Sequence, residues 1–312
     1  MNQSNAGSIN EWQSSGQSFD FKGHLDSYKV FYQTQGPKDK PALLLIHGYP
    51  SASWDWHHQW PKLIEHFQVI TLDMLGFGFS DKPAGFAKDS AVQYSIHTQA
   101  DIFTALLKKL NIKEVHVLSH DYGDTVAQEL LARSLHQEPG AIKILSLCLL
   151  NGGLFPETHK ALLLQKLLLS PIGPLVARLA SYKKFKKNFA HICAVPLSEN
   201  ELATLWRLVE FNNGKPILAK LIGYMNERKQ FRERWVGALQ KNTIPIRLID
   251  GLQDPISGAH MVKRYRELIQ QPDIIELQGV GHYPQLEAPK QVLNHFLDFH
   301  EITIPTNSHQ FN

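Results

Sequence analysis

Cysteine, net charge and long apolar runs are all scarce in this sequence of 312 residues. The two cysteines, Cys148 and Cys193, lie far apart in the chain and predict neither a disulfide framework nor a metal cluster. Lys and Arg number 32 against 29 Asp and Glu, and a net charge of +3 is too small to indicate a nucleic-acid partner. No apolar stretch reaches the roughly 20 residues of a membrane helix, so the sequence predicts no transmembrane segment.

The first 18 residues are polar and lack the basic start and apolar middle of a signal peptide. We therefore expect a cytoplasmic protein with a flexible polar leader over residues 1–18. The hydrophobic content of 43% is ample for a buried core, which excludes a disordered chain. Because the sequence has no phosphate-binding loop, metal-ligand cluster or dinucleotide fingerprint, it predicts no cofactor and no metal.

Short apolar runs alternate with amphipathic stretches along most of the chain. Runs typical of buried strands cover residues 42–46, 68–72, 114–118, 143–150, 244–249 and 274–277. Helical patterns cover residues 92–110, 122–136, 259–270 and 286–299. This alternation favours an α/β fold with a doubly wound, mostly parallel sheet. Between residues 151 and 242 only helical patterns occur. We therefore predict a core of residues 19–150 and 243–300, an inserted helical cap over 151–242, and a tail over 301–312.

One strand-to-helix junction has the frame of a nucleophile elbow. It reads Ser119-His120-Asp121-Tyr122-Gly123, with small residues at both ends and aspartate at the nucleophile position. A carboxylate is ionised at neutral pH and needs no base to attack. Its attack on a saturated carbon gives an ordinary ester that water can hydrolyse, so this aspartate indicates epoxide or alkyl halide substrates.

An acid and a histidine follow later strands in the order of a hydrolase triad. His282 would deprotonate the water that attacks the ester, and Asp254 would orient the imidazole. Asp250 competes for the second role but stands at the end of its strand, and Glu157 is a weaker competitor.

The oxyanion hole is expected from two backbone N–H groups. One belongs to Tyr49, which follows His47-Gly48, and the other to Tyr122, directly after the nucleophile. Pro50 indicates a rigid turn that a cis peptide bond would suit.

Together these motifs resemble the α/β-hydrolase superfamily, in particular its branch of epoxide hydrolases and haloalkane dehalogenases. The resemblance extends over residues 19–300, and longer stretches are similar to the mesoderm-specific transcript protein family. Those stretches are residues 118–131, 151–159, 234–239 and 282–287. The resemblance implies an α/β-hydrolase fold with a helical cap and a covalent alkyl-enzyme ester on Asp121.

The resemblance is compatible with two leaving groups, a halide and the oxygen of an epoxide. Dehalogenases typically have tryptophan directly after the nucleophile, where this sequence has Tyr122. Epoxide hydrolases use two lid tyrosines, and Tyr224 matches one of them better than Tyr182 matches the other. Further candidates for the substrate pocket are His47, Asn151, Trp206 and Tyr182.

We therefore favour hydrolysis of a small apolar epoxide, with Tyr224 as proton donor and water as the second substrate. A haloalkane dehalogenase is the alternative. A hydrolase-fold protein that binds a lipid or small ligand without turnover is the alternative from another class.

Overall fold

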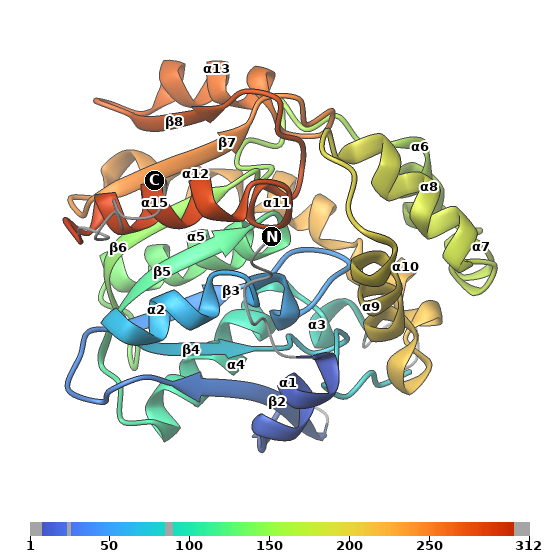
Figure 1. Cartoon of the computed structure of the whole chain (residues 1–312), viewed down its shortest axis with the longest axis horizontal. Helices are drawn as coiled ribbons and strands as arrows, with labels where there is room; N and C mark the ends of the chain where they lie inside the picture. The colour runs from blue at the N-terminus through green and yellow to red at the C-terminus, as the bar shows by residue number, and fades with distance from the viewer. Residues whose placement is uncertain (1–7, 24–25, 85–89, 303–312) are drawn as a thin grey trace, which may run out of the picture.

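The structure is a computed structural model that describes residues 8–23, 26–84 and 90–302. Its centre is an eight-stranded sheet in the order β1-β2-β4-β3-β5-β6-β7-β8 (Figure 1). The strands are β1 Gln17–Lys22, β2 Ser27–Gln35, β3 Ala42–Ile46, β4 Gln68–Leu72, β5 Glu114–His120, β6 Lys143–Leu150, β7 Ile246–Gly251 and β8 Asp273–Leu277. The pairs β1–β2 and β2–β4 are antiparallel, and all other pairs are parallel. The predicted fold class is confirmed.

Helices cover both faces of this sheet. Side chains of β3 alternate between two hydrophobic clusters, with Leu44 in one and Leu43 in the other. The first cluster contains residues of α4 Ile96–Lys109, α5 Tyr122–Leu135 and α13 Ala259–Leu268. The second contains residues of α2 Trp60–His66 and α15 Pro289–Phe299. Buried on both faces, the strands have the continuous apolar runs seen in the sequence.

Two predicted helices are each divided in the structure. In place of one helix over 92–110, the chain forms α3 Ser90–Gln93 and α4, because the side chain of Ser95 accepts the N–H of Thr98 and caps α4. In place of one helix over 286–299, it forms α14 Pro284–Glu287 and α15. Pro289 has no N–H to donate to the preceding turn, so a new helix begins there.

The flexible leader predicted over residues 1–18 is wrong for the part that the structure describes. Helix α1 Ile9–Ser15 is capped by Ser8 and packs on the core through Trp12. The Trp12 ring makes edge contacts with Trp54 and Trp60, at centroid distances of 5.6 and 5.0 Å. One large apolar side chain anchors an otherwise polar segment, which average polarity cannot reveal. Residues 1–7 of the leader and 303–312 of the tail lie outside the described residues.

Only helices occur among the secondary-structure elements between β6 and β7. They are α6 Leu163–Leu169, α7 Gly173–Arg178, α8 Tyr182–Ile192, α9 Glu199–Glu210, α10 Leu218–Leu221, α11 Tyr224–Gln230 and α12 Arg232–Lys241, with two short 3₁₀ turns before α10. We call α6 to α10 the lid helices; they lie beside the carboxyl ends of the parallel strands, at the right of Figure 1. In contrast, α12 packs against α5 of the core. The division of the chain into core and cap at 151 and 242 stays a prediction.

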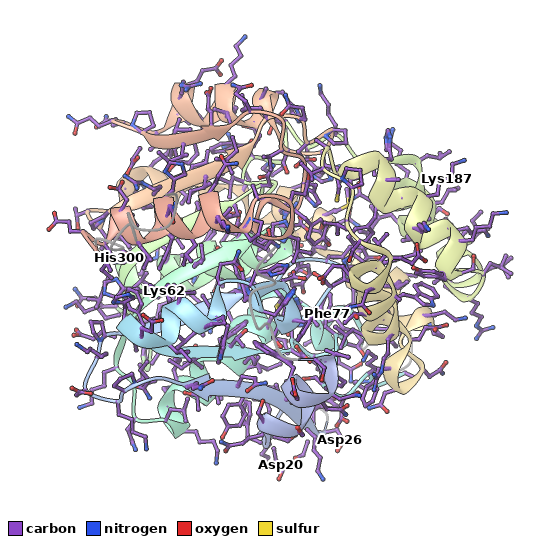
Figure 2. The ribbon with its side chains drawn as sticks, viewed as in Figure 1. Asp20, Asp26, Lys62, Phe77, Lys187 and His300 are labelled. Atoms are coloured by element: carbon purple, nitrogen blue, oxygen red, sulfur yellow. The ribbon has the colours of Figure 1, made fainter. Side chains whose placement is uncertain are left out.

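Helix α8 faces solvent with four exposed lysines, Lys183, Lys184, Lys186 and Lys187. Lys187 projects outward from α8, whereas Phe77 lies inside the molecule near the strand ends (Figure 2). Within the described part of the chain, no helix is both long enough and apolar enough to cross a bilayer.

Candidate active site

Asp121 stands at a strained turn between β5 and α5. Its backbone has φ 48° and ψ −106°, a conformation that non-glycine residues rarely adopt. Gly123 lets α5 approach β3 closely, because a β-carbon there would lie 2.5 Å from the carbonyl oxygen of Ile46. The turn directs the carboxylate of Asp121 into a cavity at the strand ends, as a nucleophile elbow does.

His282 lies between two carboxylates. Its Nδ1 is 2.7 Å from Oδ2 of Asp254, and its Nε2 is 3.9 Å from Oδ2 of Asp121. Asp254 is itself fixed by hydrogen bonds from the amide of Asn151 at 3.1 Å and the hydroxyl of Ser257 at 2.9 Å. Asp254, His282 and Asp121 thus form a chain of neighbouring groups in which the imidazole could activate a water molecule for ester hydrolysis.

The electrostatics of these groups are strongly coupled. Burial disfavours the Asp121 carboxylate, but His282 and Arg228 outweigh burial and hold the pKa of Asp121 below its ordinary value. Burial also disfavours the imidazolium of His282, but Asp254 and Asp121 outweigh it and raise the pKa of His282 to about 9. The site therefore holds an ionised Asp121 carboxylate beside a charged His282.

The two competing acids do not contact His282. Asp250 lies within β7, which ends at Gly251 and not at the predicted residue 249. Burial raises the pKa of the Asp250 carboxyl well above its usual range. Glu157 is half-buried and paired with Arg232 and Arg264. Geometry thus favours Asp254 as the partner of His282.

The two predicted oxyanion donors are backbone N–H groups near Asp121. The N–H of Tyr49 donates to Oδ2 of Asp121 at 3.2 Å. The N–H of Tyr122 begins α5, where no residue of the helix can accept it. The two hydroxyls point elsewhere: that of Tyr49 donates to the carbonyl of Leu218 and that of Tyr122 to the carbonyl of Tyr94. The bond between Tyr49 and Pro50 is cis.

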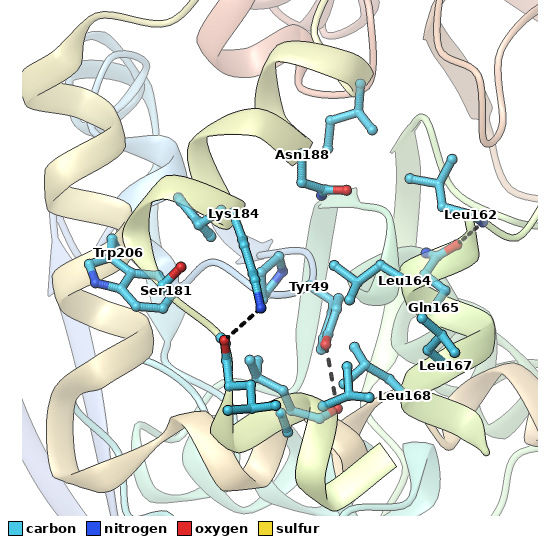
Figure 3. Close-up of a pocket in the computed structure, with 18 of the residues that line it drawn as sticks. Tyr49, Leu162, Leu164, Gln165, Leu167, Leu168, Ser181, Lys184, Asn188 and Trp206 are labelled. Atoms are coloured by element: carbon cyan, nitrogen blue, oxygen red, sulfur yellow. Dashed lines mark hydrogen bonds between the residues drawn. The ribbon is translucent and has the colours of Figure 1, made fainter. Parts of the chain in front are cut away.

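A cavity of about 410 Å³ lies between the lid helices and the strand ends. In the view of Figure 3, the lid leucines Leu164 and Leu168 are on the same side as Tyr49, and Trp206 is on the opposite side. Asp121 and His282 lie at the core side of the cavity, and most of the remaining lining is aliphatic. Such a cavity suits an apolar molecule whose reactive carbon is presented to Asp121.

The residues predicted to line the substrate pocket differ in their position relative to the cavity. Trp206 lines the cavity, whereas Asn151 acts one layer away by holding Asp254. His47 is buried beneath the site, where its Nε2 accepts the N–H of Met74. Tyr182 does not line the cavity, because its hydroxyl donates to Glu199 of α9 at 2.6 Å. Tyr224 is 1% exposed and packs against the Tyr122 ring, at a centroid distance of 4.7 Å.

Arg228 is a site residue that sequence reasoning misses. It is 2% exposed, its Nη2 donates to the carbonyl of Asp121 at 3.0 Å, and the same nitrogen is 3.7 Å from Oδ1 of that residue. Its Nε donates to Thr125 at 2.7 Å, and its guanidinium lies 4.5 Å from the ring centre of Tyr224. The only sequence signal is the spacing of one helical turn between Tyr224 and Arg228.

One group of the described residues has metal-ligand chemistry. Ligand atoms of His57, His58 and Glu201 lie within 4.8 Å of one another. None of the three residues lines the cavity. The indole N–H of Trp54 donates a hydrogen bond to Glu201, and Nδ1 of His57 is hydrogen-bonded to the carbonyl of Trp54.

Comparisons with known proteins identify the family of this fold. Residues 41–289 match the alpha/beta hydrolase fold family. The mesoderm-specific transcript homolog protein of Homo sapiens is 41% identical over 93% of this chain and 87% of its own length. The putative hydrolase LipZ of Mycobacterium tuberculosis is 39% identical over 84% of this chain and 88% of its own. The resemblance stated from the sequence is confirmed.

Solved structures share the fold at lower identity. A haloalkane dehalogenase variant, DbeA-M1 from Bradyrhizobium elkanii, has a TM-score of 0.72 at 19% identity, covering 92% of this chain and 98% of its own. The epoxide hydrolase CorEH has a TM-score of 0.69 at 20% identity, covering 91% and 99%.

Proposed function

The chain belongs to the alpha/beta hydrolase fold family, and from that premise we propose that it is a hydrolase with an aspartate nucleophile, acting first of all on apolar epoxides. The observation that carries the proposal is the carboxylate of Asp121 at the elbow, ionised and 3.9 Å from Nε2 of His282. A carboxylate in this position is suited to attack a saturated carbon.

In the first step, the carboxylate of Asp121 attacks one epoxide carbon. A carbon–oxygen bond to the enzyme forms, the ring bond breaks, and the ring oxygen takes a proton. We assign that proton to Tyr224, whose pKa burial raises above its ordinary value, so that it is protonated at neutral pH. Its ring packs near those of Tyr49 and Tyr122 and against the guanidinium of Arg228, which donates to the carbonyl of Asp121.

In the second step, His282 takes a proton from water and the resulting hydroxide attacks the carbonyl carbon of the ester. The N–H groups of Tyr49 and Tyr122 would stabilise the oxyanion that develops there. Collapse expels the second oxygen as an alkoxide, which takes the proton of the added hydroxide and leaves as the diol. The carboxylate returns with one oxygen from water, and the proton on His282 passes to the Tyr224 phenolate. The sum is one epoxide and one water giving one diol.

The test is repeated turnover in oxygen-18 water with a panel of 1,2-epoxyalkanes and bromoalkanes. We expect diol formation and mass labelling confined to Asp121, and accumulation of the ester when His282→Gln removes the base. Asp121→Asn is the matched control that forms no ester. Absence of product and label from every substrate would remove the enzyme proposal in favour of a binding protein.

Dehalogenation is the second candidate, supported by Trp206, whose indole lines the cavity and offers an N–H. Bromide release without diol formation from any epoxide would favour it. Tyr224→Phe separates the two mechanisms, because epoxide opening needs the phenolic proton and halide departure does not.

A further inference from the structure

The segment between β3 and α2 meets the lid helix α9 at three side chains that can bind a metal ion. His57 and His58 follow the 3₁₀ turn Ser53–Trp56, and Glu201 lies in the first turn of α9. Nε2 of His57 is 3.4 Å from Oε2 of Glu201, and each of the three residues places a ligand atom within 4.8 Å of the other two. Because Glu201 is far from the two histidines in the chain, no ligand spacing in the sequence reveals the group. None of the three takes part in the proposed hydrolysis.

Trp54 orients the ligand atoms of His57 and Glu201. Nδ1 of His57 is 2.8 Å from the carbonyl oxygen of Trp54, which can only accept, so Nδ1 carries the proton. The lone pair of the neutral ring is then on Nε2, the atom that faces Glu201. On the carboxylate, Oε1 accepts the indole N–H of Trp54 at 3.0 Å, and Oε2 is directed toward the ring. Hydrogen bonds of this kind fix the tautomer and the orientation of the ligands in metal sites.

Packing holds the two rings in place and leaves a path from solvent. The ring of His57 stacks on that of Trp54, with a centroid distance of 4.1 Å and an angle of 6° between the planes. The ring of His58 lies against His57 at a centroid distance of 3.8 Å. The side chains of His57 and Glu201 are 4% and 13% exposed, whereas His58 is half-buried. An ion and a water molecule can therefore reach the group from the side of His58.

The lone pair of Nε2 and the carboxylate oxygen of Glu201 repel each other unless a cation lies between them. A proton on Nε2 would give an ordinary ion pair, but it makes no use of the ring nitrogen that His58 places beside them. A divalent metal ion uses all three groups. Two imidazoles and one carboxylate suit Zn²⁺, whereas Mg²⁺ and Ca²⁺ prefer oxygen ligands alone. Three protein ligands leave the fourth position of a tetrahedral zinc ion to water.

We infer that Nε2 of His57, a ring nitrogen of His58 and Oε2 of Glu201 form a zinc-binding site that joins the lid helix α9 to the core. The bound ion restrains the helix that also contributes Trp206 to the wall of the cavity. The site is separate from Asp121 and does not depend on the proposed function.

Titration of zinc chloride into the chelator-treated full-length protein, followed by calorimetry, tests the site without any substrate. We expect one zinc ion to bind per chain, and no competition from magnesium or calcium. Glu201→Gln and His58→Gln each remove a ligand, so they should weaken binding by more than about ten-fold, the effect of losing an outer hydrogen-bond partner alone. NMR of the histidine ring nitrogens should show coordination through Nε2 of His57, and coordination through Nδ1 would contradict the geometry.

Glu199→Gln on the same helix and His136→Gln are the matched controls, because both side chains are exposed and lie outside the group. Far-UV circular dichroism checks that every variant is folded. Zinc should also slow hydrogen exchange of the α9 amides in the wild type, but not in Glu201→Gln. The inference is overturned if no zinc binds to the wild type, in which case His57 and Glu201 form an ion pair only. It is equally overturned if the controls lose binding as the ligand variants do, or if bound zinc leaves exchange in α9 unchanged.

Discussion

At the scale of single residues, the charge on His282 changes during the proposed cycle. In the resting protein, burial is outweighed by Asp254 and Asp121, and the pKa of His282 is raised to about 9. Alkylation turns Asp121 into a neutral ester and removes one of these charges, so the pKa of His282 falls in the intermediate. A base must be uncharged to accept a proton from water. We therefore expect the rate of ester hydrolysis to rise with pH and to level off below pH 9.

Rapid-quench single turnovers across a pH series measure this rate directly. The alkylation rate is the internal control, since the pKa of Asp121 lies below its ordinary value and the nucleophile stays ionised at neutral pH. A hydrolysis rate that falls with rising pH would exclude His282 as the base.

Asp121, Asp254 and His282 could be predicted as site residues because each follows a strand, and parallel strands end at one edge of a sheet. Geometry brings them into contact, and their catalytic roles stay a prediction. Arg228 could not be predicted in the same way. A lone arginine on a helix is usually exposed, whereas this one is buried and donates to Thr125 of α5 and to the carbonyl of Asp121.

At the scale of elements, Glu129 joins α5 to α12. Its carboxylate is 2.7 Å from Nε of Arg133, 2.7 Å from Nε of Arg234 and 2.8 Å from the indole nitrogen of Trp235. Burial disfavours this carboxylate, but the hydrogen bonds from His97 and the other partners prevail and hold the pKa of Glu129 far below its ordinary value. The carboxylate therefore stabilises the folded state.

We expect Glu129→Gln to lower the free energy of unfolding at neutral pH by about 2–4 kcal/mol, because the partly buried arginines lose their counter-charge. The contribution of a carboxylate with a depressed pKa is complete above its unfolded pKa, near 4.5, and is lost as the pH falls toward its folded value. The difference between variant and wild type should therefore shrink in acid. Urea unfolding at several pH values measures it.

Glu233→Gln on α12 is the matched control, because that side chain is 93% exposed. Its expected effect is within about 0.5 kcal/mol. An equal loss of stability in both variants, or a Glu129→Gln difference that grows in acid, would contradict the assignment.

The elements themselves were predictable where periodicity was strong and uninterrupted. The strands at 42–46, 68–72 and 143–150 have the predicted bounds. The breaks at Ser95 and Pro289 were missed because an apolar helical pattern continues across both of them. Helix α1 was missed because its burial depends on one side chain, Trp12, and on tryptophans more than 40 residues later.

At the scale of the whole molecule, the site lies at a junction between the sheet and the lid helices. The proposed catalytic groups come from the strand ends, whereas the aliphatic walls come mainly from α6, α7 and α8. The sequence shows that helices follow β6, but it does not show which of their faces enclose the cavity. Those faces are set by helix packing, and they decide the length of substrate that can reach Asp121.

The cavity predicts a dependence on chain length. Each methylene that moves from water into the aliphatic walls contributes about 0.8 kcal/mol, which is about four-fold in kcat/KM. For 1,2-epoxyalkanes we therefore expect kcat/KM to rise with chain length until the cavity of about 410 Å³ is full. Ala180 lines this cavity between α7 and α8, so Ala180→Phe should shorten the longest chain that is accepted and leave the shortest epoxides unaffected. Ala190→Phe on the exposed side of α8 is the matched control and should leave the series as it is. If Ala180→Phe lowers activity equally for every chain length, the aliphatic chain does not lie against the lid, and the substrate reaches Asp121 from another direction.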